Sequence, residues 1–510
     1  MAATLQAPNL LEAPESADWN HDEEKSERLW LVALGAMVVV HLWFGLISTS
    51  FRLDETATWW VVKDGAAEAA RRSFYWSGQS PLFYWTAWLS SRLFGLSEVS
   101  LRIPSVGAMA GAAYFLYRIA ERFDRASAGL TALVFVCLAS YFAIDARPYA
   151  LAFFFLTLSA WAFLCWLDTG RPVGAMVYVL AGAAVIYAHC LMAPALGATA
   201  IYGIVALRKQ PLQLTWLVGL WVSIGLLCVP LLPQLQLFYG ARSAHTYSVP
   251  PSLSQFTDSF LPGAPWSAIL LGIWICLLFY RDATVVRKCA GPAALLAVAW
   301  SLFPQVFLYL LSAAGDLQLY VPKYYSSALP GQALLLGILI SSIRPSSIRK
   351  LIVVALALTS LLIQGKGAVR SHGSEDWRSA MQFVNKEAGA RVPVLIMSGF
   401  VEAADFASLR KTALRDVLFA PQVVYGEPGR TIRLPNAFSG RDEADLEYVA
   451  RQLEDEPRFF LLTENGDRTY ETWLLGRLGS RCKSEQRGRE RFAEVWLTRF
   501  TCDRQDEFSH

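Results

Sequence analysis

Charged side chains are scarce in this sequence. Asp, Glu, Lys and Arg make up 17% of the 510 residues, whereas soluble domains carry about 25%. Hydrophobic residues make up 54% of the chain, and the mean hydropathy is +0.35. The formal net charge of +3 is too small to indicate a protein that binds nucleic acid. This composition is typical of an integral membrane protein.

Two kinds of sequence signal are also missing. The 8 Cys and 6 His form no CxxC pair and no Cys/His array with zinc spacing, which excludes metal-finger proteins. Residues 1–28 are polar and acidic, and they lack the basic start, apolar core and small-residue cleavage site of a signal peptide. We therefore expect residues 1–28 to form a disordered cytoplasmic tail.

Long apolar runs divide the rest of the chain into two parts. They dominate residues 29–365, whereas residues 366–510 are rich in Arg, Glu and Asp. Because a helix that crosses a bilayer needs about 20 residues, the first part predicts a membrane domain of about eleven transmembrane helices. The expected spans are 29–50, 100–120, 127–143, 149–167, 173–189, 190–207, 214–232, 267–280, 289–312, 325–343 and 349–364.

The charge of each loop indicates the side on which it lies. Residues 81–96 are apolar, but Ser90, Ser91 and Arg92 interrupt them. If this segment lies in the interface without crossing, the loops on the N-terminal side are all basic, as the positive-inside rule requires. Those loops contain Arg122, Arg125, Arg171, Arg208, Lys209, Arg281, Arg287, Lys288, Arg344, Arg349 and Lys350. We therefore predict a juxtamembrane helix at 81–96, a cytoplasmic N-terminus, and residues 366–510 on the external face.

Acidic side chains occur in two of the predicted external loops. Asp54 and Glu55 directly follow the first span, and the short loop AIDARPYA places Asp145 beside Arg147 and Tyr149. One interpretation is a set of solvated carboxylates at the membrane boundary. The other is a cleft in which a carboxylate takes a proton from an attacking hydroxyl group.

Basic side chains on the same face fit the second interpretation. Arg147, Lys323 and either Arg71 or Arg72 are candidates for neutralising a phosphate leaving group. The alternatives are contacts between the arginines and ordinary lipid headgroups, and a snorkelling role for Lys323. His189 lies near the outer end of its span, where a functional role and a hydrogen-bonded core role both remain open.

Six segments in order resemble one known family. They are LDETATWW (53–60), SGQSPLFYWTAWLSSRLFGLSEVSLRIPSVGAMAG (77–111), YFAIDARPYAL (141–151), IYAHCLMAPAL (186–196), YVPKYYSSALPG (320–331) and SEDWRSAMQFVNKEAG (374–389). Together they resemble the bacterial relatives of dolichyl-phosphate-mannose protein mannosyltransferases. These relatives are GT-C glycosyltransferases of the glycosyltransferase 39 and aminoarabinose-transferase type.

The resemblance implies an enzyme and a set of partners. The expected activity is transfer of a sugar, with inversion, from a polyprenyl-phosphate-linked donor to a lipid, glycan or protein hydroxyl on the periplasmic face of the inner membrane. No essential cofactor is expected, although a divalent metal ion at Asp54 and Asp145 is left open. The rival hypotheses are a flippase for a lipid-linked saccharide, which would need polar groups along several spans and often an internal repeat, and a non-catalytic lipid binder.

The resemblance also assigns residues. It implies that Asp54 is the general base with Glu55 beside it, and that the second-loop acid and its neighbours are Asp145, Arg147 and Tyr149. The remaining correspondences are His189, Lys323 and Tyr324. Two positions depart from the family: Gln79 and Ser80 stand where relatives have a basic residue or His before the proline, and Lys323 replaces an Arg, which removes the bidentate fork.

Residues 366–510 predict a small α/β domain. A helix is expected over 376–388 and strands over 392–400, 458–465 and 491–502. Cys482 and Cys502 are the Cys residues of this part of the chain, and in an oxidising periplasm we expect them to form a disulfide. No catalytic set is evident here, so the expected role is to cover the membrane cleft or to help bind the acceptor.

Overall fold

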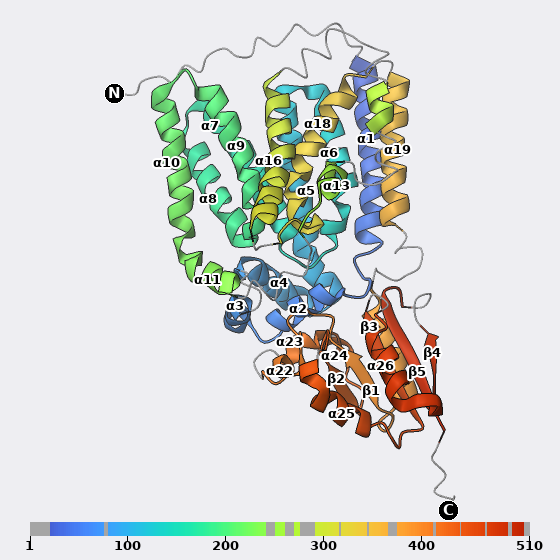
Figure 1. Ribbon diagram of the computed structural model, residues 1–510. Helices are drawn as coiled ribbons and strands as arrows, with labels where there is room; N and C mark the ends of the chain where they lie inside the picture. Colours follow the sequence, from blue (N-terminus) through green and yellow to red (C-terminus); the bar gives the residue numbers. More distant parts are fainter. Residues whose placement is uncertain are drawn as a thin grey trace, which may run out of the picture.

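A bundle of long helices carries a small sheet domain at one end (Figure 1). The computed structural model describes residues 21–75, 80–240, 250–260, 270–275, 291–315, 318–343, 346–365, 375–411, 415–438, 440–464, 467–487 and 492–503. Short helices form a layer between the bundle and the sheet domain. This layer is where the segments of functional interest meet.

The bundle is built from apolar helices, several of which begin at a proline. Pro172, Pro211 and Pro292 each occupy the first turn of a helix, where the missing N–H has no intrahelical partner to lose. The helices and helical turns are α1 (His21–Val39) with η1 (Val40–Phe44), α5 (Glu98–Phe123), α6 (Arg125–Ala143), α7 (Tyr149–Thr169), α8 (Pro172–Ala188), η2 (Cys190–Leu196) with α9 (Gly197–Leu207), α10 (Pro211–Cys228) with η3 (Val229–Leu231) and α11 (Leu232–Gly240), α13 (Leu253–Phe260), α16 (Pro292–Ala314), α17 (Pro322–Tyr325), η4 (Ser326–Ala328), α18 (Leu329–Ser341) and α19 (Ser346–Gln364).

Length and composition separate the helices that can cross a bilayer. Within the described residues, 8 helical stretches are long and apolar enough, and Pro172–Ala188 is a shorter apolar helix. The expected span 325–343 consists of η4 and α18 with the end of α17, and α18 itself has only 13 residues. The expected span 267–280 lies outside the described residues except for 270–275. The count of about eleven spans therefore stays a prediction.

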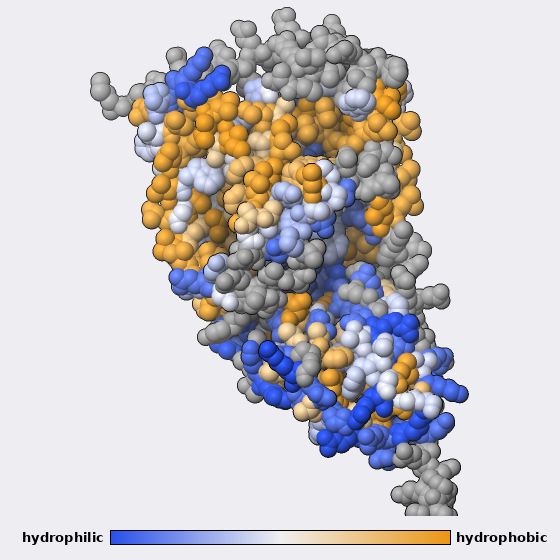
Figure 2. Space-filling view, in the orientation of Figure 1, coloured by the Kyte–Doolittle hydropathy of each residue, from blue (hydrophilic) through white to orange (hydrophobic). Residues whose placement is uncertain are grey.

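The surface of the bundle is hydrophobic, as the composition predicts for a membrane domain. Figure 2 shows apolar residues over the bundle and hydrophilic residues over the sheet domain. On α10, Leu212, Trp216 and Leu226 each expose more than 60% of their surface. Exposed apolar patches of this extent indicate contact with lipid.

The layer at the end of the bundle contains α2 (Leu53–Val62), α3 (Ala66–Tyr75) and α4 (Pro81–Phe94). The 14 residues of α4 are too few to cross about 30 Å of hydrocarbon at 1.5 Å per residue. In Figure 1, α4 lies across the end of the bundle beside α2 and α3. The expectation of a juxtamembrane helix at 81–96 is confirmed.

The C-terminal part forms a mixed sheet covered by helices. The strand order is β2-β1-β3-β5-β4, with β1 (Val394–Met397), β2 (Thr431–Leu434), β3 (Arg458–Glu464), β4 (Cys482–Arg487) and β5 (Val495–Cys502). β1 is parallel to β2 and β3, whereas β5 is antiparallel to β3 and β4. The remaining helices and helical turns are α21 (Trp377–Ala388), α22 (Phe406–Leu409), α23 (Arg415–Leu418), α24 (Ala420–Tyr425), η5 (Gly440–Asp442), α25 (Glu443–Arg451), α26 (Thr469–Leu478) and η6 (Gly479–Arg481). The predicted small α/β domain is confirmed.

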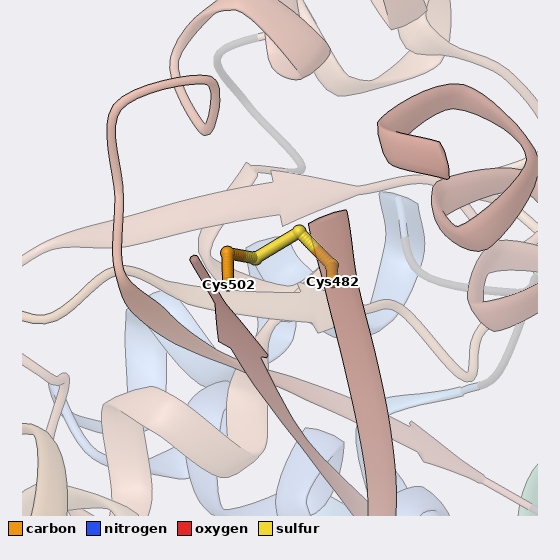
Figure 3. The surroundings of a disulfide bond; sticks show 2 residues. All are labelled: Cys482 and Cys502. Atoms are coloured by element: carbon orange, nitrogen blue, oxygen red, sulfur yellow. A yellow bond between two sulfur atoms is a disulfide. The ribbon is translucent and has the colours of Figure 1, made fainter. Parts of the chain in front are cut away.

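A disulfide closes the edge of the sheet, and a shared apolar cluster joins the sheet domain to α2. The sulfur atoms of Cys482 and Cys502 are 2.08 Å apart and join directly opposed residues of β4 and β5 (Figure 3). Leu53 and Trp60 of α2 share a buried cluster with Trp377 and Phe460 of the sheet domain. The bundle and the sheet domain are therefore packed together. The expected boundary at 365/366 borders residues that the structure does not describe, so it stays a prediction.

Candidate active site

The first turn of α2 is fixed by one buried carboxylate. Glu55 occupies the third position of the helix, and its Oε2 accepts a hydrogen bond from the backbone N–H of Arg52 at 2.9 Å. Arg52 has an extended backbone with ψ of 161°, so the helix begins at Leu53. A carboxylate that satisfies an N-terminal N–H in this way stabilises the start of a helix.

Glu55 also joins α2 to two other segments. Arg102 of α5 binds it with both arms of its guanidinium, Nε to Oε1 at 2.8 Å and Nη2 to Oε2 at 2.6 Å. The backbone N–H of Ala146 donates to Oε1 at 2.8 Å. Burial of Glu55 opposes its ionisation, but Arg102 and Arg52 outweigh this effect and lower its pKa to about 2. Glu55 is therefore a charged anchor that orients the residue before it.

Asp54, that preceding residue, lines a cavity. Its Oδ2 accepts a hydrogen bond from Lys323 Nζ at 2.6 Å, and both side chains are close to 40% exposed. The Nη1 of Arg147 donates to the backbone carbonyl of Asp54 at 3.4 Å. Burial raises the pKa of Asp54, yet the charges of Arg147 and Lys323 outweigh it and hold the pKa below its ordinary value.

The cavity has a volume of about 200 Å³ and three kinds of wall. Charged and aromatic side chains from the bundle end form the first, and apolar side chains of α8, η2, η3 and α11 form the second. The third is a loop of the sheet domain. The described lining consists of Leu53, Asp54, Ser80, Arg147, Tyr149, Ile186, Ala188, His189, Cys190, Leu191, Leu231, Gln234, Leu235, Phe238, Lys323, Tyr324, Gly399, Phe400, Val401 and Glu402.

Aromatic rings flank His189 within this lining. The ring of His189 stacks on Tyr149 with centroids 4.8 Å apart, and Tyr324 lies 5.5 Å away on centroids. His189 and Arg147 are each only 7% exposed. Among the described residues, His189 Nδ1 and Arg147 Nε have no hydrogen-bond partner. Buried polar atoms without a partner are rare in proteins and point to an absent ligand or water.

Asp145 lies behind the cavity rather than in its described lining. Arg52 Nη2 is 3.2 Å from its Oδ1, and the side chain of Asp145 is 3% exposed. Burial raises the pKa of Asp145 above its ordinary value despite the nearby Arg52. Its Oδ2 has no hydrogen-bond partner among the described residues. Asp145 and Glu55 thus both hold the base of the loop, and of these three acids Asp54 is the one in the described lining of the cavity.

Of two other predicted positions, Arg72 lies elsewhere and Gln79 is not described. The guanidinium of Arg72 is engaged by Glu68, by Asp64 and by the carbonyl of Trp60, and Arg72 is outside the described lining of the cavity. Gln79 lies outside the described residues. Its neighbour Ser80 lines the cavity and caps α4 by accepting a hydrogen bond from the N–H of Leu82.

The structure adds residues that the sequence analysis did not consider. Gly399 to Glu402 follow β1, which lies between the parallel strands β2 and β3. Ligands often bind at the carboxyl ends of parallel strands where the strand order reverses. The run VPVLIMSGF indicated a strand, but not its place in the sheet. Burial raises the pKa of Glu402. Across the described residues, no group of three or more His, Cys, Asp or Glu is arranged to hold a metal ion.

Comparisons with known proteins agree with this architecture. The sequence profile of the family described as dolichyl-phosphate-mannose-protein mannosyltransferase matches residues 78–233. No curated protein matches the chain. Among solved structures, ArnT from Cupriavidus metallidurans in the apo state has a TM-score of 0.55 and 13% identity, over 93% of this chain and 98% of that one. The same protein bound to undecaprenyl phosphate has a TM-score of 0.54 and 13% identity, over 92% and 98%. The likeness to ArnT concerns the fold, and with the profile match it confirms the resemblance drawn from the motifs.

Proposed function

We propose that the chain is a GT-C membrane glycosyltransferase, in line with the profile match over 78–233 and the fold shared with ArnT. It transfers a sugar from a polyprenyl-phosphate carrier to a hydroxyl group of a lipid, glycan or protein, with Asp54 as general base. One observation carries the proposal. A reachable carboxylate, Asp54, shares a cavity with two cations, Lys323 and Arg147, at the boundary between the apolar bundle and the sheet domain.

The walls of the cavity match the parts of such a donor. Lys323 and Arg147 neutralise the phosphate, and the unpartnered Arg147 Nε and His189 Nδ1 gain a ligand atom to contact. Leu231, Leu235 and Phe238 form the apolar side on which a prenyl chain packs. The sugar then lies between the phosphate and Asp54.

The reaction follows from this placement. Asp54 takes the proton of the acceptor hydroxyl, whose oxygen forms a bond to the anomeric carbon. The bond from that carbon to the phosphate oxygen breaks, and the polyprenyl phosphate leaves with the electron pair. Attack opposite the leaving group inverts the anomeric centre. Lys323 and Arg147 stabilise the negative charge that grows on the phosphate.

Donor binding and base strength are coupled through the same cations. Without a donor, Lys323 is paired with Asp54 and lowers its basicity together with Arg147. A bound phosphate competes for both cations and weakens their hold on the carboxylate. The pKa of Asp54 therefore rises toward its ordinary value when the donor is in place, which suits a general base.

The predicted topology places the reaction on the periplasmic side. The basic loops are expected in the cytoplasm. The cavity is lined by residues of α2, α11 and the loop after β1, and these elements lie at the end of the bundle where the sheet domain is attached (Figure 1). On this face no soluble nucleotide sugar is required, because the donor arrives in the membrane on its lipid carrier.

Asp54→Asn tests the proposal directly. In a deletion strain, lipid and glycan profiling identifies the sugar residue that is lost. We expect the wild-type gene to restore this sugar residue. The Asp54→Asn gene is expected to restore less than about one hundredth of the wild-type amount, because the general base is removed. Binding of undecaprenyl phosphate to the purified variant is expected to tighten about two- to fivefold, since a half-exposed competing carboxylate is gone.

The matched control is Asp64→Asn. Asp64 lies just after α2 and pairs with Arg72, outside the described lining of the cavity, so this variant is expected to restore the missing sugar. Transfer by purified protein in detergent, where no compartment remains to transport across, separates a transferase from a flippase. Full restoration by Asp54→Asn at equal protein levels would overturn the proposal.

A further inference from the structure

The backbone that leads into Asp54 is held by the sheet domain. The N–H of Phe51 donates to the hydroxyl of Tyr425 at 2.8 Å, and the N–H of Leu53 donates to Glu375 Oε2 at 2.6 Å. Leu53 is the first residue of α2 and directly precedes Asp54. Two successive contacts from a distant part of the chain therefore fix the turn from which Asp54 projects.

Glu375 is itself firmly attached to the sheet domain. Its backbone forms an isolated antiparallel bridge with Ala493, and the N–H of Asp376 donates to the carbonyl of Phe492 at 3.2 Å. The indole Nε1 of Trp377 donates to Glu375 Oε2 at 3.0 Å, and Trp377 is 1% exposed. A buried indole thus sets the position of the same oxygen that receives the Leu53 N–H.

The hydrogen bond from Leu53 to Glu375 satisfies a backbone N–H that has no partner within α2. The first N–H groups of a helix have no intrahelical carbonyl to bind. Glu55 accepts the N–H of Arg52, and Glu375 accepts the N–H of Leu53. The first carboxylate comes from α2 and the second from the sheet domain, so the orientation of the turn depends on both parts of the molecule.

We propose that Glu375 is a positioning residue for the reaction, which holds Asp54 in place through the backbone N–H of Leu53. The proposal rests on the proposed function of Asp54. Glu375 lies outside the described lining of the cavity, so it acts on the substrate only through the turn that it holds. A sheet domain attached in this way is part of the catalytic apparatus and more than a cover for the cleft.

The role of Glu375 is that of a hydrogen-bond acceptor. Burial raises its pKa to about 7, with the nearby charge of Asp54 contributing in the same direction. The hydrogen bonds from Leu53 and Trp377 act in the opposite direction and favour the charged form. Both the charged and the neutral carboxyl group keep an oxygen that accepts a hydrogen bond. Both donors, Leu53 N and Trp377 Nε1, bind one and the same oxygen, which the amide oxygen of Gln can replace.

The test compares Glu375→Ala with Glu375→Gln in the full-length protein. For Glu375→Ala we expect about tenfold less transferred sugar in the complemented deletion strain, because a small misplacement of a catalytic group is costly. Hydrogen–deuterium exchange of peptides covering 51–62 is expected to speed up in the same variant, while undecaprenyl phosphate binds as in the wild type. Glu375→Gln is expected to restore both transfer and protection to within about twofold.

Glu387→Ala is the matched control. Glu387 also belongs to the sheet domain, but it pairs with Arg499. Its replacement tests whether the loss of any ion pair of the sheet domain speeds up exchange. We expect exchange at 51–62 to stay unchanged in this variant. Unchanged exchange in Glu375→Ala, or a Glu375→Gln variant as impaired as Glu375→Ala, would overturn the proposal. The exchange readout does not depend on the chemistry, so a failure of Asp54 as the base is seen separately, in Asp54→Asn.

Discussion

The ion pair between Asp54 and Lys323 brings the proposed base and the proposed phosphate-binding cation into one cavity. Lys323 Nζ is 2.6 Å from Asp54 Oδ2, so in the absence of a donor each charge is partly neutralised by the other. The sequence shows Lys323 where the resembling family has Arg. An ammonium group offers charge without the planar fork of a guanidinium, so the charge rather than the geometry of the side chain is expected to matter.

Substitution of Lys323 tests this expectation. Lys323→Ala is predicted to weaken binding of undecaprenyl phosphate about tenfold, which is the lower end for a charge-assisted hydrogen bond at a half-exposed site. Lys323→Arg keeps the charge and is predicted to stay within about threefold. The measurement is titration of the purified protein, with Lys63→Ala at the end of α2 as the control. Equal affinity in wild type and Lys323→Ala would remove Lys323 from the phosphate site.

Sequence reasoning reached the residues of the cavity that belong to recognisable motifs. Asp54, Arg147, His189 and Lys323 come from four separate segments, and the structure brings them to one cavity. The partner of Glu55, Arg102, was not foreseen, because it lies 47 residues away in a helix whose apolar pattern gives no sign of a buried ion pair. Local pattern determines where a helix runs, whereas pairing between helices depends on their packing.

At the level of elements, the sequence predicted the buried strands of the sheet but not the strands at its edges. The apolar runs of β1 and β3 were recognised because strands covered on both faces are continuously hydrophobic. β2 (TIRL) and β4 (CKSEQR) were not, since they lie at the two edges of the sheet and their sequences carry charged side chains. Edge strands of this kind are short and polar because an apolar edge would pair with other chains.

The loop after β1 approaches the first turn of α2 closely at Gly399. A Cβ atom at this position would overlap the carboxylate of Glu464 and would lie 2.6 Å from Leu53 Cδ2. Both are the ends of side chains, so Gly399→Ala is predicted to displace these side chains, to destabilise the protein by about 1 kcal/mol and to reduce transfer. Thermal unfolding and profiling of the complemented strain measure the two effects.

Gly476→Ala provides the comparison for that substitution. Gly476 lies within α26, and a Cβ atom there meets nothing within 4 Å. This variant is expected to be neutral or slightly stabilising, because Ala favours helix over Gly by about 1 kcal/mol. If both glycine variants behave alike, close packing between the loop and α2 is not what holds this wall of the cavity.

On the scale of the whole molecule, the sheet domain packs on the juxtamembrane layer through the shared core and makes polar contacts with the first residue of α5. Arg378 Nη2 donates to Glu98 Oε1 at 2.6 Å, and the hydroxyl of Tyr425 donates to the same oxygen at 2.9 Å. Such docking was beyond the reach of the sequence, which shows a change of composition near residue 365 but not the surfaces that meet. The division into two compositional halves therefore describes the chain better than it describes the folded molecule.

The disulfide bears both on the stability of the sheet domain and on the side of the membrane on which this domain lies. Cys482 and Cys502 are separated by 20 residues, and closing a loop of this size stabilises a fold by about 3 kcal/mol in the chain-entropy account. Replacing both by Ser is predicted to lower the melting temperature of the sheet domain while transfer at moderate temperature persists, because the pair joins β4 to β5 at the edge of the sheet. Cys228→Ser, which removes a free thiol of α10, is the control.

Non-reducing mass spectrometry of protein from intact cells is expected to find the two cysteines joined, as an oxidising periplasm would allow. Free thiols at both positions would contradict the disulfide and would also argue against a periplasmic sheet domain.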